Sequence, residues 1–90
     1  MPFVLICRFK PGALQVRMDN RSAHLAYLEA TGVVTLAGPF LDDEGKPTGS
    51  MIVLEVADKA AADAWAAGDP YAMAGLFEAV TVQAWRKVVG

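Results

Sequence analysis

The chain has 90 residues, of which 54% are hydrophobic and 20% charged, a composition that excludes a disordered chain and leaves room for one hydrophobic core. The formal net charge is -2 and the eight basic residues are scattered, so nucleic acid is not an expected partner. We therefore predict a single folded domain over residues 1–90.

Membrane attachment and metal binding are also not expected. The apolar run Phe3–Cys7 is too short to span a bilayer or to act as a secretory signal, which favours a cytoplasmic protein without a membrane partner. Cys7 is the only cysteine and His24 the only histidine, so the chain has no set of soft ligands for zinc. We therefore expect no metal. Since the chain also lacks a glycine-rich phosphate-binding motif, we expect no cofactor.

The first half of the chain predicts a strand, a helix and a second strand. Phe3–Phe9 is rich in β-branched and aromatic residues and ends in a turn. A helix is expected from Leu14 to Ala30, ended by Gly32, with a sheet-facing stripe at helical spacing made by Leu14, Met18, Leu25 and Leu28. Residues 33–40 have strand composition, but Gly38 and Pro39 predict a bend or an edge position there.

The second half predicts a strand, two helical segments and a last strand. After a charged loop, residues 50–56 form a third strand. Asp58 is a good N-cap for a helix over residues 59–67 that ends at Gly68. Asp69 caps a short helix that begins with Pro70 and reaches about Leu76. Residues 79–89 alternate well enough to form the fourth strand.

This order of elements is βαββαβ, the ferredoxin-like α+β arrangement, in which a four-stranded antiparallel sheet carries both main helices on one face. The first and third strands nevertheless place apolar side chains on both faces, for example Val4 against Leu5 and Met51 against Ile52. Helices cover only one of these faces. We therefore expect a homodimer in which a second copy of the sheet covers the other face.

Two residues stand out as candidates for chemistry. His24 is predicted to lie mid-helix at the flank of the buried stripe, beside Arg21, whose cation would hold an anionic ligand group near a histidine base. A structural histidine bonded to a backbone carbonyl is an equally good interpretation of the pattern. Asp69 is first of all a helix cap, although a capping carboxylate is also able to orient a histidine. Ser50 reads as a ligand contact or simply as a polar strand end.

The chain resembles the YCII-related family of small bacterial proteins, which belong to the dimeric α/β-barrel group. The matching segments occur in the family's order and span nearly the whole chain: Arg21-Ser22-Ala23-His24-Leu25, Ala37-Gly38-Pro39, Gly49-Ser50, Asp69-Pro70-Tyr71 and Ala74-Gly75-Leu76-Phe77. The resemblance implies catalytic roles for His24 and Asp69 and a role in the site for Ser50.

The resemblance also limits the reaction. One branch of the family is similar to a dehydrochlorinase of a chlorinated hydroxyquinol, and related folds include isomerases and cofactor-free monooxygenases. The first hypothesis is therefore a cofactor-independent lyase or isomerase, in which His24 moves a proton, Asp69 orients it, and Arg21, Ser50 or Tyr71 holds a small anionic or aromatic substrate. The alternative is a non-catalytic dimer that binds a metabolite or a protein partner through the same cleft.

Overall fold

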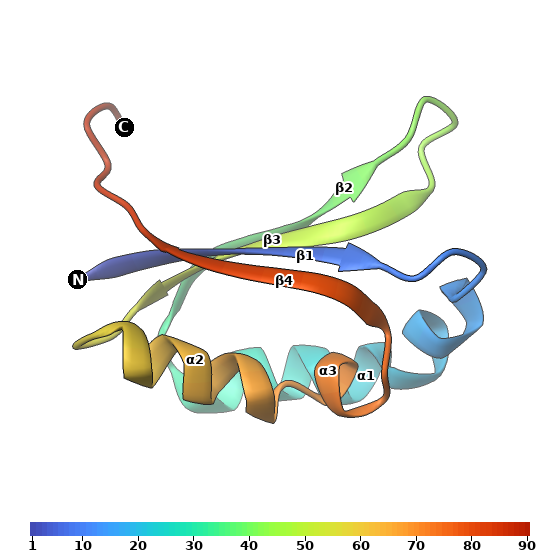
Figure 1. Cartoon of the computed structure of the whole chain (residues 1–90), viewed down its shortest axis with the longest axis horizontal. Helices are drawn as coiled ribbons and strands as arrows, with labels where there is room; N and C mark the ends of the chain where they lie inside the picture. Colours follow the sequence, from blue (N-terminus) through green and yellow to red (C-terminus); the bar gives the residue numbers. More distant parts are fainter.

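The computed structural model describes all 90 residues and has the predicted α+β order. The helices lie together beneath one face of a single antiparallel sheet, and the other face carries no helix (Figure 1). The strand order across the sheet is β2-β3-β1-β4. The elements are β1 Pro2–Phe9, α1 Leu14–Thr31, β2 Val34–Leu41, β3 Pro47–Glu55, α2 Lys59–Gly68, α3 Pro70–Met73 and β4 Phe77–Ala84.

The core lies between the sheet and the helices. Along β1, side chains alternate between a buried helix-facing set and a partly exposed set, as the two-residue period of a strand requires. The main cluster combines helix-facing residues of β1 and β3 with two residues of α2: Phe3, Leu5, Cys7, Ile52, Leu54, Ala62 and Trp65. No helix of the structure is long and apolar enough to cross a membrane.

Several local expectations are confirmed. Gly32 ends α1 in the left-handed conformation at φ 66°, where glycine avoids the steric cost of a Cβ. The side chain of Asp58 caps α2 by accepting a hydrogen bond from the Ala61 N–H at 2.8 Å. β2 lies at the edge of the sheet, where Gly38 and Pro39 are tolerated because one side of the strand needs no ladder partner.

Two predicted element ends are wrong, each for a physical reason. β4 stops at Ala84 and not at Val89: the Trp85 N–H still donates to the Pro2 carbonyl oxygen at 3.0 Å, but Pro2 is the first residue of β1, so the residues after Trp85 have no partner strand. α3 ends at Met73 and not near Leu76, because Gly75 turns the chain at φ 76°.

Gly68 is the last residue of α2, so the predicted end of this helix is confirmed. Its lack of a side chain serves packing, since a Cβ there would lie 2.6 Å from the Tyr27 hydroxyl oxygen. That hydroxyl donates a hydrogen bond to the Trp65 carbonyl oxygen at 2.8 Å, which ties α1 to α2.

Candidate active site

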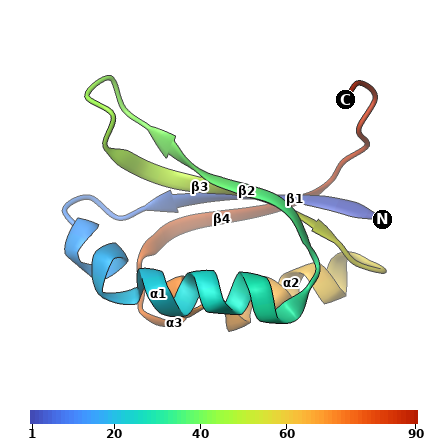
Figure 2. The same ribbon diagram turned by 180° about the vertical axis from the view of Figure 1, so that it is seen from behind.

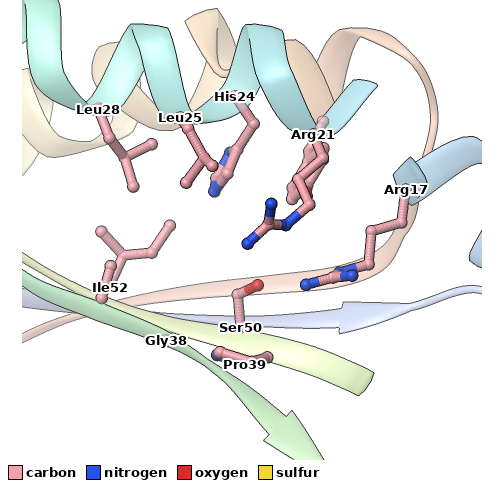
Figure 3. Close-up of a pocket in the computed structure, with 11 residues that line it drawn as sticks. Arg17, Arg21, His24, Leu25, Leu28, Gly38, Pro39, Ser50 and Ile52 are labelled. Atoms are coloured by element: carbon pink, nitrogen blue, oxygen red, sulfur yellow. The ribbon is translucent and has the colours of Figure 1, made fainter. Parts of the chain in front are cut away.

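A small pocket opens between α1 and the β2–β3 side of the sheet. Figure 2 shows α1 running beneath this side of the sheet, and Figure 3 shows side chains from both elements facing each other across the gap. The pocket has a volume of about 180 Å³. Its lining comprises Arg17, Arg21, His24, Leu25, Leu28, Ala37, Gly38, Pro39, Ser50, Ile52 and Tyr71. The space is close to the roughly 150 Å³ of a cavity that accepts benzene, so it suits a ligand with one ring.

The face that α1 turns to the sheet differs from the predicted one. Of the expected stripe, Leu28 packs against the core as predicted, but Leu14, Met18 and Leu25 are 39%, 66% and 45% exposed. His24 is the only buried residue of the helix, at 5% exposure. The prediction that His24 lies only at the flank of the buried stripe is therefore wrong: His24 is more deeply buried than any other residue of α1.

His24 and Asp69 lie in direct contact although 45 positions separate them in the sequence. Nδ1 of His24 lies 2.7 Å from Oδ1 of Asp69, and the two residues are 5% and 1% exposed. Asp69 reaches this position because it stands between α2 and α3 in an extended conformation, with Pro70 as the first residue of α3. Its Oδ1 also accepts the Tyr71 backbone N–H at 3.0 Å, so one carboxylate caps α3 and holds the histidine.

The hydrogen bonds fix the direction of the imidazole. A carboxylate has no proton to donate, so Nδ1 of His24 is the donor in this contact. In the neutral ring the proton then resides on Nδ1, and Nε2 keeps a free electron pair. Since His24 lines the pocket, this nitrogen is available to accept a proton from a bound molecule.

Tyr71 supports the histidine from one side. Its ring is stacked on the imidazole with centroids 3.8 Å apart and planes 7° apart, and it makes edge contacts with Phe9 and Phe77. Tyr71 is only 2% exposed. Burial raises the pKa of its hydroxyl, and the positive charges of Arg17 and Arg21 oppose that rise. Tyr71, which the sequence analysis proposes as a substrate-holding residue, thus forms part of the pocket wall and packs against His24.

The remaining predicted residues also line the pocket. Arg21 extends from α1 toward the sheet, and the hydroxyl of Ser50 rises from β3 toward it (Figure 3). Ser50 is buried and lies within β3, which begins three residues earlier than expected at Pro47.

Arg17 is the pocket residue that the sequence analysis missed. Arg17 precedes Arg21 by four residues in α1, and both side chains line the same cavity. A signal for it exists, because Arg17, Arg21, His24 and Leu28 recur at alternating spacings of four and three, which is one face of a helix. The spacing of the apolar residues in α1 predicts a different buried face, so this stripe was not identified.

Other reactive groups near the pocket carry no evident chemistry. Burial raises the pKa of Cys7 to about 12, with a smaller contribution from the nearby Asp69 charge, so the thiol stays protonated near neutral pH and is a poor nucleophile. No group of three or more His, Cys, Asp or Glu side chains lies close enough to hold a metal ion.

Comparison with known protein families supports the resemblance noted from the sequence. The family model of the YCII-related domain matches residues 1–86. The chain belongs to the YCII-related family. Protein YciI of Escherichia coli is 37% identical over 98% of this chain and 99% of its own length, and an uncharacterised Haemophilus influenzae protein is 35% identical over the same shares.

One of the solved structures that resemble this chain is that of an enzyme. The 5-chloro-2-hydroxyhydroquinone dehydrochlorinase of Burkholderia phenoliruptrix, solved with 2,5-dihydroxybenzoquinone, is 37% identical with a TM-score of 0.87, covering 96% of this chain and 94% of its own. An antibiotic biosynthesis monooxygenase is 16% identical with a TM-score of 0.60, covering 98% of both chains. The second similarity establishes the fold alone.

Proposed function

We propose that this protein is a cofactor-independent enzyme that removes a proton from a small ring compound in an elimination or isomerisation. His24 acts as the general base through Nε2, and Asp69 orients the imidazole and stabilises its protonated form. The observation that carries the proposal is the 2.7 Å contact between His24 Nδ1 and Asp69 Oδ1 at the wall of a pocket sized for one ring. The similarity to a dehydrochlorinase supports the elimination.

The chemistry needs no redox partner. In the keto tautomer of a chlorinated hydroquinol, the carbon that bears chlorine also bears hydrogen. Loss of HCl from it breaks one O–H bond and the C–Cl bond: the O–H electrons form a C=O bond, a ring double bond shifts, and chloride leaves with the C–Cl electron pair. His24 takes the proton at Nε2 and becomes a cation beside Asp69. A 2.7 Å separation is typical of a charge-assisted hydrogen bond, which strengthens as this charge develops.

The direct test is chloride release from 5-chloro-2-hydroxyhydroquinone by the purified protein. We expect release above the uncatalysed rate, measured with a chloride electrode. If the protein neither releases chloride nor binds 2,5-dihydroxybenzoquinone, the proposed elimination is wrong.

A second candidate is a non-catalytic binding module. The near-complete burial of His24 and Asp69, together with the stacking of Tyr71 on the imidazole, is also what a purely structural polar pair requires. In that case 2,5-dihydroxybenzoquinone would bind in the pocket and leave with no chemical change to the chlorinated compound. The chloride assay and a binding titration together separate the two functions.

We also propose that the protein is a homodimer formed through the helix-free face of the sheet. This face holds an open apolar groove of about 340 Å³ lined by Val4, Ile6, Leu36, Met51, Val53, Gln83 and Trp85. Leu36 is 50% exposed and Trp85 42% exposed in the single chain. A contiguous apolar surface of this kind is usual at interfaces and costly in water.

The dimer is tested by light scattering with two matched variants. We expect the parent protein to have a mass near 19 kDa, twice the 9.6 kDa of the chain. Leu36→Lys, on the helix-free face, should give monomers because burying an unpaired charge is unfavourable. Met18→Lys, at a 66% exposed position of α1, should leave the dimer intact. A monomeric parent, or equal dissociation of both variants, would contradict the proposal.

A further inference from the structure

Two arginines on α1 face the same pocket. Arg17 and Arg21 both line it and lie four residues apart, so their side chains leave neighbouring turns of one helix face. Figure 3 shows both guanidinium groups reaching from the helix toward β3 and the Ser50 hydroxyl. Like charges at this spacing destabilise a helix by a few tenths of a kcal/mol, roughly 0.2–0.5. An anionic group bound between the two guanidinium groups would relieve this repulsion.

The protein itself supplies no compensation. Neither Arg17 nor Arg21 forms an ion pair with any carboxylate, since the ion pairs of the structure involve Met1, His24, Lys46 and Lys59. The Nε atom of Arg17 is buried and has no hydrogen-bond partner. A buried donor without a partner costs about 1–3 kcal/mol, more for a charged group.

The nearby acidic groups are occupied elsewhere. Asp69 is the carboxylate of the pocket region, and its Oδ1 is already shared by His24 and the Tyr71 N–H. Asp19, also on α1, accepts a hydrogen bond from Gln15 and is exposed. The influence of Arg17 and Arg21 on the nearby Tyr71 hydroxyl is consistent with positive charge gathered on this side of the pocket.

We propose that Arg17 and Arg21 form a clamp for an oxyanion of the ligand, either a carboxylate or an ionised ring hydroxyl, while His24 faces another part of the same molecule. Guanidinium groups match such oxygens because their N–H donors are arranged as a planar fork. The volume of about 180 Å³ limits the ligand to one ring or less. The substrate class is thus a small monocyclic anion. This inference rests on the proposed function only in taking the pocket as the ligand site.

The test is a pair of one-ring probes of nearly the same size and shape, one a carboxylate anion and the other its neutral amide. Benzoate and benzamide are titrated separately into ¹⁵N-labelled protein, and binding is followed by amide chemical shifts around the pocket. We expect benzoate to bind at least about tenfold more tightly than benzamide, the ratio that charge-assisted hydrogen bonds give. Arg17→Gln and Arg21→Gln should each remove about that factor. Arg86→Gln is the matched control, since it removes the same charge from the exposed C-terminal segment outside this pocket.

The outcomes separate the clamp from the catalytic proposal. Arg17→Gln should weaken benzoate binding by the same factor in the His24→Gln background as in the parent, because the clamp does not use the imidazole. Equal binding of benzoate and benzamide, equal losses in Arg17→Gln and Arg86→Gln, or no shifts near the pocket would each overturn the clamp. Circular dichroism of each variant excludes unfolding as the cause. A failed chloride assay with intact, arginine-dependent benzoate binding would reject the proposed elimination and leave the clamp in place.

Discussion

Replacing His24 with glutamine is expected to lower the rate of chloride release from 5-chloro-2-hydroxyhydroquinone by roughly 10²–10⁴-fold, the usual contribution of a positioned general base. Glutamine has a similar reach and forms hydrogen bonds, but its amide does not accept a proton near neutral pH. The loss should appear in kcat, because the clamp residues that hold the ligand are unchanged. Initial rates measured across substrate concentrations with a chloride electrode check this expectation.

Asp69→Asn is the companion variant for this measurement. Asparagine is also a good N-cap, so α3 and the fold should persist, whereas alanine would remove a cap worth about 1 kcal/mol. The amide retains an acceptor for one hydrogen bond but lacks the negative charge that stabilises protonated His24. We expect an intermediate loss of kcat. Full activity in His24→Gln, with an unchanged circular dichroism spectrum, would mean that another group moves the proton.

The largest effect on stability is expected from Gly49→Ala. Gly49 is buried in β3, and a Cβ at this position would lie 2.3 Å from the backbone carbonyl oxygen of Cys7 in the neighbouring strand β1. The contact is with backbone and not with a flexible side-chain end, so β1 and β3 would have to separate. Overpacking of this kind costs about 1–3 kcal/mol of the free energy of unfolding, and sometimes more.

Gly38→Ala is the matched control for the stability measurement. Gly38 also lies within a strand, and a Cβ there would have nothing within 4 Å. Its backbone is outside the positive-φ region, so alanine should change the free energy of unfolding little or raise it by about 0.4–1 kcal/mol. Urea unfolding curves of both variants give the comparison. Equal midpoints for Gly49→Ala and Gly38→Ala would show that the β1–β3 contact is easily relaxed.

The sequence predicts most of the fold because its local signals agree with one another. Alternating apolar residues mark the strands, Asp58 and Pro70 mark helix starts, and Gly32 marks the end of α1, each through a local mechanism that does not depend on distant residues. The wrong boundary of β4 has a non-local cause. The last residues have strand composition, but the partner strand β1 ends before it can pair with them.

The candidate site is less predictable for two reasons. The stripe of α1 that faces the sheet contains two arginines and a histidine, so hydrophobic spacing indicates a neighbouring face that includes the exposed Leu14 and Met18. The contact between His24 and Asp69 depends on how α1 and α3 pack, which periodicity does not reveal. The roles of His24 and Asp69 were predicted from the family resemblance. Arg17 was not predicted, because its only signal in the sequence is its spacing from Arg21.

The proposed mechanism requires that His24 presents a bare Nε2 to the ligand while its Nδ1–H is held by Asp69. A long-range ¹H–¹⁵N spectrum of the imidazole, recorded at a pH where the ring is neutral, tests this directly. We expect a protonated Nδ1 and an unprotonated Nε2, with only the Nε2 resonance shifting strongly when 2,5-dihydroxybenzoquinone is added. A proton on Nε2, or a ligand that shifts neither nitrogen, would contradict it.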